Sequence, residues 1–273
     1  MPDTMRRRAL LVLFEGLACL ATVFCALFAA LGLTLWRAHY LVSCMDRTGY
    51  PAQIVQGLRV SCVTYAQEYD LTLSSLTGSW NEALVRRELI RSVDETYHQV
   101  RPARPTPFDS IVENPDIGQV GRELVALWSA AVGTPFSNLL NILLQYSRAS
   151  AVPITLFLGV GAGSLAMLFR ASRDRRQLGG CAAEVGRAVT LCAPVLPGAL
   201  ALVCARLDWL PEQSPAAALF SAWSTGFFVC WALCLLAAAA CWAALGFALR
   251  RPAAPSLRFR HGRLEQNGGM GLC

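Results

Sequence analysis

Four long apolar runs constrain this chain more than any other feature. They cover residues 9–36, 151–169, 188–205 and 216–249. Each reaches or approaches the roughly 18 to 20 residues that a helix needs to cross a hydrocarbon core. Three of the runs carry no arginine, acidic residue or histidine, and the first carries only Glu15. Because backbone polar groups in lipid need internal partners, the runs predict an all-α integral membrane protein with four transmembrane helices.

The arginines predict the orientation of these helices. All 24 Lys-plus-Arg residues are arginine, and most of those near the spans fall in residues 1–8, 170–187 and 250–273. Basic residues beside a span are retained in the cytoplasm. We therefore expect an N-in/C-in protein whose 170–187 loop is cytoplasmic. Residues 37–150 and a short turn at 206–215 would then lie outside.

The basic balance of the chain is explained by its expected contact with the lipid bilayer. The formal net charge is +6, but residues 37–150 are nearly neutral, so the excess lies beside the membrane. Orientation and anionic headgroups account for that distribution, and no nucleic acid is expected as a partner. The first run ends at Trp36 and Arg37 rather than at a small-residue cleavage site, which favours an uncleaved anchor. Abundant Ala and Arg without Lys indicate GC-rich coding. This composition favours a bacterial protein, and we expect it in the cell membrane, that is, the inner membrane of the bacterium.

Residues 37–150 are expected to form a mostly helical extracytoplasmic domain between the first and second spans. Ser79 and Glu82 make a capping box, and helical spacing continues from there without Gly or Pro until Pro102. Residues 51–69 are a second helical candidate. The segment is long enough for a small domain of its own.

Residues 118–147 allow two interpretations. An apolar stripe and a polar face alternate at helical spacing, so the segment lies either on the outer membrane surface or against the extracytoplasmic domain. Gly133 and Pro135 predict a break into two helices. A fifth span is rejected, because it would place the arginines of 170–187 outside.

Two pairs of residues inside the spans predict features of helix packing. Gly159 and Gly163 are four residues apart and form a small-residue face that lets another helix approach closely. Pro194 and Pro197 remove backbone donors and predict a kink in the third span. Such a kink is either a hinge or, more simply, a packing adjustment.

Glu15 is the one charge embedded in a predicted span. It enters from the expected cytoplasmic end, where Arg187 precedes the third span. A Glu15–Arg187 ion pair would lock two helices or gate a polar path. The alternative is a carboxylate that reaches the interface without a partner.

The residue types that carry chemistry show no catalytic pattern. Seven of the eleven cysteines lie in predicted spans, where Cys behaves as a small hydrophobe. Cys44 and Cys62 are the two cysteines of the outer segment, and they form a disulfide if that compartment is oxidising. The three histidines are scattered, and no HExxH, GxSxG, Walker or dinucleotide fingerprint occurs. We expect no catalytic residues, no metal site, no cofactor and no enzymatic activity.

These features favour a non-enzymatic multi-pass membrane protein. A substantial outer domain beside spans nearly free of polar groups is typical of an accessory or sensor-like subunit of a membrane complex. Its partners would be other membrane or envelope proteins, or further copies of itself. The alternative is a small transporter or channel component that works as an oligomer and uses Glu15, the glycine face and the two prolines.

Overall fold

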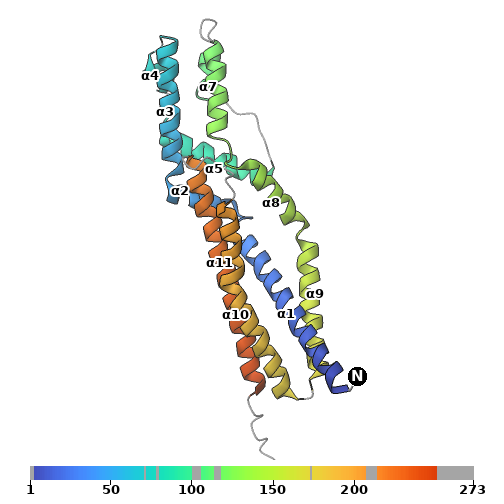
Figure 1. The fold of residues 1–273 in the computed structure, drawn as a ribbon. Coiled ribbons are helices and arrows are strands. Elements are labelled where there is room, and N and C mark those ends of the chain that lie inside the picture. The colour runs from blue at the N-terminus through green and yellow to red at the C-terminus, as the bar shows by residue number, and fades with distance from the viewer. Residues whose placement is uncertain are drawn as a thin grey trace, which may run out of the picture.

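The computed structural model describes residues 3–70, 72–77, 80–99, 106–113, 118–172, 174–206 and 214–250. Every regular element in these ranges is an α-helix (Figure 1). In chain order the helices are α1 (Asp3–Leu33), α2 (Ala38–Thr48), α3 (Tyr50–Glu68), α4 (Leu73–Thr77), α5 (Glu82–His98), α6 (Asp109–Val112), α7 (Gly118–Ala131), α8 (Ser137–Ala149), α9 (Ala151–Ala171), α10 (Arg175–Arg206) and α11 (Pro215–Arg250). The predicted C-terminal tail lies outside the described residues, apart from Arg250, which ends α11.

Four of the helices are long and apolar enough to cross a membrane, namely α1, α9, α10 and α11. They contain the four apolar runs, except for residues 34–36 at the end of the first, and fit a multi-pass membrane protein. The third differs from its expected length, since α10 begins at Arg175, thirteen residues before the run at 188–205. Much of the expected loop is helical because Leu178, Cys181 and Val185 continue the buried face of α10.

The α10–α11 pair is the most extensive interface between spans, and glycines make it possible. A Cβ on Gly179 would lie 2.8 Å from the Gly246 carbonyl oxygen, and one on Gly246 would lie 2.9 Å from that of Gly179. A Cβ on Gly186 would lie 3.3 Å from the Ala239 carbonyl oxygen, a tight but less severe contact. Backbones that approach this closely gain van der Waals contact, which drives helix association where lipid offers no hydrophobic force.

Helix α1 packs against the other three spans. Near its N-terminus, the Arg7 side chain donates from Nε to the carbonyl oxygen of Ala171 at 2.7 Å, capping the end of α9. Farther along, the Trp242 indole of α11 donates to the Thr22 hydroxyl at 3.1 Å. The first span is therefore held by polar contacts as well as by packing.

Helices α2 to α7 form what we call the helical cap, at the end of the bundle opposite the N-terminus (Figure 1). Helix α11 extends beyond the other spans into the cap, where it packs against α2 and α3. Its residues Leu219 and Trp223 are almost completely buried there. Leu41 and Val85 of the cap belong to the same core cluster as these two residues. Cap and bundle therefore share one hydrophobic core.

The segment 118–147 is divided into α7 and α8, as Gly133 and Pro135 predicted. Helix α7 packs on α6 of the cap, where a Cβ on Gly121 would lie 2.6 Å from the Val112 backbone nitrogen. Helix α8 leads into α9, with Leu140 and Leu144 buried. The first half of the segment thus belongs to the cap, and a position on the membrane surface stays a prediction for α8.

Candidate functional site

An open groove of about 600 Å³ lies between α2 and α5 of the cap. Its lining combines small apolar side chains with charged ones: Ala38, His39, Val42, Ser43, Asp46, Arg47, Ile90 and Asp94. Binding sites typically join an apolar surface to a few placed polar groups in a concavity of this size. The groove is therefore the candidate functional site.

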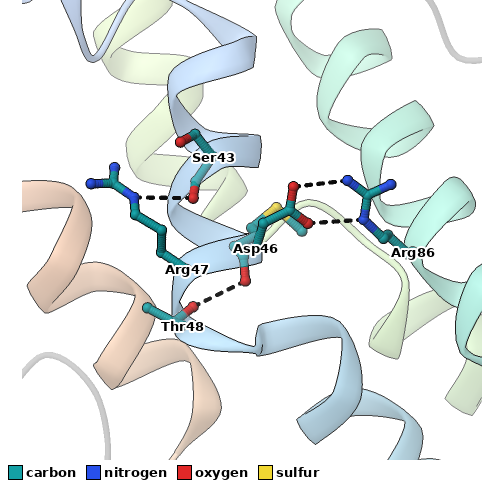
Figure 2. A network of polar contacts seen from close by, with 6 residues as sticks. Ser43, Asp46, Arg47, Thr48 and Arg86 are labelled. Carbon is teal, nitrogen blue, oxygen red and sulfur yellow. Dashed lines mark hydrogen bonds and ion pairs between the residues drawn. The ribbon is translucent and has the colours of Figure 1, made fainter.

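Two side-chain contacts determine the relative direction of α2 and α5, the two walls of the groove. At one end, Arg86 of α5 donates from Nε and Nη2 to the two carboxylate oxygens of Asp46 at 2.9 and 2.8 Å (Figure 2). At the other end, the Tyr97 hydroxyl donates to the Leu35 carbonyl oxygen at 2.8 Å. Early α5 meets late α2, and late α5 meets the residues before α2, so the two helices are antiparallel.

Helix α5 owes its starting point to a side-chain cap. The Asn81 side chain accepts a hydrogen bond from the Leu84 backbone nitrogen at 2.9 Å, so the helix begins at Glu82. The expected capping residue, Ser79, lies outside the described residues. One face of α5 is then buried through Val85, Leu89 and Val93. The adjacent face then carries Ile90 and Asp94, which line the groove, and Arg86, which pairs with Asp46.

The charges of the groove are only partly matched. The hydrogen bonds from Arg86 hold the pKa of the Asp46 carboxyl below its ordinary value, so these two groups neutralise each other. Asp94 has a weaker partner, His98 at 3.8 Å, and its side chain is 65% exposed. Arg47 donates to the Ser43 carbonyl oxygen and the Cys44 sulfur rather than to a carboxylate. Among the described residues, Asp94 thus borders the groove without a close counter-ion, whereas the Arg47 side chain projects from α2 away from Asp46 and Arg86 (Figure 2).

The helices that line the groove are also tied to the candidate spans. The Tyr40 hydroxyl on α2 donates to the Trp223 carbonyl oxygen of α11 at 3.1 Å. It lies directly over Gly226, the position on α11 where a Cβ would collide with it. Burial raises the pKa values of both Tyr40 and Tyr97, so these phenols stay protonated as donors. A displacement of α2 or α5 would therefore act on α11 and on the end of α1.

The structure does not bring Glu15 and Arg187 together. Arg187 donates to Glu184 of its own helix at 2.7 Å, and Glu15 lies against the Cys181 thiol. Cys44 and Cys62 are free thiols, and both are fully buried in the same core cluster. Neither the expected ion pair nor the expected disulfide is formed among the described residues.

The helix-packing residues also fall outside the groove. A Cβ on Gly159 or Gly163 would meet no atom within 4 Å, so this glycine face of α9 is open rather than packed on another described helix. Pro194 and Pro197 lie within α10, which continues as one helix through both. The predicted kink stays a prediction. The contacts that do bring spans together involve other glycines, on α10 and α11.

The sequence does not predict the groove, although Asp94 shares part of a helix with Glu95 and His98, a possible metal-binding set that is more often a solvated polar face. His39, Ser43 and Asp46 recur on one face of α2, which is the signal that marks a polar helix surface. Such a face is usually only solvated. Its role as a groove wall depends on α5, which follows it by some 40 residues. In the part of the chain that the structure describes, no three His, Cys, Asp or Glu side chains gather closely enough to hold a metal ion.

Comparison with known proteins adds no family to this description. No family model matches the chain, and neither a curated protein nor a solved structure is significantly similar to it.

Proposed function

We propose that this chain is a non-enzymatic, sensor-like or accessory subunit of a membrane complex, with the α2–α5 groove as its contact site. One observation carries the proposal: the α2 wall of the groove is hydrogen-bonded to the candidate span α11 through Tyr40, and the α5 wall is hydrogen-bonded through Tyr97 to Leu35, two residues beyond the end of α1. A partner that binds between α2 and α5 would therefore bias the packing of α1 and α11. A partner couples the groove to the spans if it binds one packing arrangement of these helices more tightly than another.

The proposed orientation places the cap outside the cell and both termini in the cytoplasm of a bacterium. It is supported by the arginines at the span ends remote from the cap, at Arg7, Arg170, Arg175 and Arg250. Alkaline phosphatase joined after residue 99 should be active, since it folds only outside the cytoplasm. A fluorescent protein joined after residue 273 should fluoresce. An inactive phosphatase fusion that is expressed at full length would contradict the orientation.

A small transporter or channel component is the other candidate, and the spans favour it less. Glu15 lies against Cys181, and Thr22 accepts a hydrogen bond from Trp242, so these polar groups bind across helix interfaces. Groups that form a conduction path face water or the transported solute instead. The intramembrane polar residues are better explained as interhelical contacts.

Purification of the full-length chain from native membranes in mild detergent, after light crosslinking, tests membership of a complex. We expect a stoichiometric partner in the wild-type preparation. We expect much less of it for His39→Trp, which fills the groove, and an unchanged amount for Arg59→Trp, an exposed position on α3. Recovery of the chain alone would refute the accessory function and would make solute flux in liposomes the next question.

A further inference from the structure

We infer that α8 is an interfacial helix whose Ile142 and Tyr146 side chains lie among the lipids of the leaflet next to the cap, and that its two ends transmit changes in that leaflet to α5. The inference goes beyond the proposed function, since it requires no partner in the groove. It follows from the three stripes on the surface of α8, from the length of α9 and from the contacts at the ends of α8.

The surface of α8 is divided into three stripes of residues spaced three or four apart, which share one side of a helix. Leu140 and Leu144 form a buried stripe in the protein core. The polar stripe beside it consists of Asn141, Gln145 and Arg148. The apolar stripe is exposed, with Ile142 52% and Tyr146 69% accessible. Because the buried stripe already packs α8 on the protein, the apolar stripe is a second apolar surface that faces outward.

The length of α9 places α8 at the boundary of the membrane. Helix α9 has 21 residues, which cover about 31 Å at the rise of an α-helix, and a hydrocarbon core is about 30 Å thick. It can therefore cross the core without residues of α8. Pro153 lacks the N–H that would bond to the Ala149 carbonyl oxygen, so the regular hydrogen bonding is interrupted between the two helices. Helix α8 is inclined to α9 at the end of the bundle next to the cap (Figure 1).

The apolar stripe suits the headgroup region at this boundary. Tyr146 lies five positions before Ala151, where α9 begins, and amphipathic aromatic rings settle at that level of a membrane. Val152 and Leu156 of α9 are also exposed, so apolar surface continues from the span to α8. A helix that buries one apolar side in the interface and keeps a polar side in water has this arrangement. Lipid is therefore the partner that the apolar stripe fits.

Both ends of α8 are attached to α5. At the C-terminal end, Arg148 donates to the side-chain oxygen of Gln99, the residue that follows α5, at 2.8 Å. Just before the N-terminal end, the Thr134 hydroxyl donates to the Ser92 carbonyl oxygen at 2.8 Å. A change in the position of α8 would therefore act on the second half of α5. Because α5 is also a wall of the groove, the leaflet could act on the candidate functional site by this route.

Fluorescence quenching in the full-length protein tests the lipid contact. A coumarin amino acid replaces Ile142 in the apolar stripe or Gln145 in the polar stripe, both exposed positions, and the protein is reconstituted in phosphatidylcholine nanodiscs. Phosphatidylcholine with a nitroxide on its headgroup quenches from the lipid, and iodide quenches from water. We expect position 142 to be quenched mainly by the nitroxide lipid and position 145 mainly by iodide.

Hydrogen exchange in α5 tests whether the lipid contact is transmitted. The protein is compared in nanodiscs of dilauroyl- and dioleoyl-phosphatidylcholine, whose hydrocarbon cores differ in thickness. We expect the amides of residues 92–98 to exchange at different rates in the two lipids, since local opening reports local stability. Arg148→Ala should reduce this difference, and the further change Thr134→Val should abolish it. Gln145→Ala leaves both links to α5 intact, so this matched control should retain the difference.

Three results would overturn the inference: similar quenching at positions 142 and 145, protection of position 142 from both quenchers, or α5 exchange that is the same in the two lipids. Protection from both quenchers would assign the apolar stripe to a protein partner or to a second copy of the chain. Neither readout depends on a partner in the groove, so the result is independent of the assignment as a subunit.

Discussion

The contact between Tyr40 and Gly226 makes the sharpest prediction about how the cap is attached. A Cβ at position 226 would overlap the Tyr40 hydroxyl, whereas the next atom of that ring, Cζ, would lie 3.2 Å away. Gly226→Ala must therefore displace the tyrosine, and overpacking of this kind costs about 1–3 kcal/mol. Tyr40→Phe alone removes one half-buried hydrogen bond to the Trp223 carbonyl, which costs about 1 kcal/mol.

The double variant distinguishes this contact from two independent effects. Without the hydroxyl, the added methyl meets only the ring edge, so Tyr40→Phe should rescue most of the damage caused by Gly226→Ala. We expect a combined loss of about 1–1.5 kcal/mol, where independent effects would add to about 3 kcal/mol. Coupling of this size is typical of residues in contact.

Thermal unfolding of the full-length protein in detergent, followed by intrinsic tryptophan fluorescence, measures these losses. A change of 1 kcal/mol shifts the melting temperature by about 2–4 °C for a chain somewhat smaller than this one. Gly57→Ala, where a Cβ meets no atom within 4 Å, is the matched control for helix propensity and should stabilise α3 by about 0.5–1 kcal/mol. Additive losses in the double variant would refute the attachment through Tyr40.

Three further predictions concern the spans, the cap and the groove. Gly179→Ala should lower stability by about 1–3 kcal/mol, because its Cβ would lie 2.8 Å from the α11 backbone. Gly159→Ala is the control and should not lower stability, because its Cβ meets no atom within 4 Å. Melting temperatures of the two variants test this difference. Asn81→Ala should cost about 1 kcal/mol through loss of the α5 cap, and should increase amide exchange in the first turn of that helix. Arg86 lowers the pKa of Asp46 in the folded protein. The stability that this carboxyl contributes is therefore complete above its pKa in the unfolded chain, and it is lost as the pH falls through its lower pKa in the folded protein. Asp46→Asn should therefore flatten the decline of melting temperature with acid; an unchanged decline would contradict the pairing.

The spans could be predicted from the sequence because their signal is local. An apolar run of sufficient length needs no information about its neighbours, and all four runs lie in helices that could cross a membrane, apart from the last three residues of the first run. The ends of the helices were less predictable. Helix α10 continues back to Arg175 because part of that segment is buried, and this burial depends on the tertiary structure rather than on the local composition.

The groove could not be predicted, because it depends on a pairing between distant segments. Asp46 and Arg86 are 40 residues apart, and nothing in either helix alone specifies the other. The expected Glu15–Arg187 pair is not formed, because Arg187 has a local partner: it pairs with Glu184, one turn earlier on its own helix. Pairs three or four residues apart are always within reach on a helix, so they compete with any distant partner.

The open glycine face of α9 illustrates the limit of a packing motif. Gly159 and Gly163 have the spacing that allows close helix approach, yet the described helices approach each other at Gly179 and Gly246 instead. The motif indicates a backbone that can be approached and does not say by which helix. Only the arrangement of the four spans determines which small residues are used.

Site-specific photocrosslinking detects directly whether the α2–α5 groove contacts a partner. A benzophenone amino acid replaces His39 in the groove or, as the control, the exposed Arg59 on α3, and the cells are irradiated before membranes are isolated. We expect one abundant crosslinked species from position 39 that position 59 does not give. Equal labelling from both positions, or no crosslink from position 39 in a chain that folds normally, would contradict it.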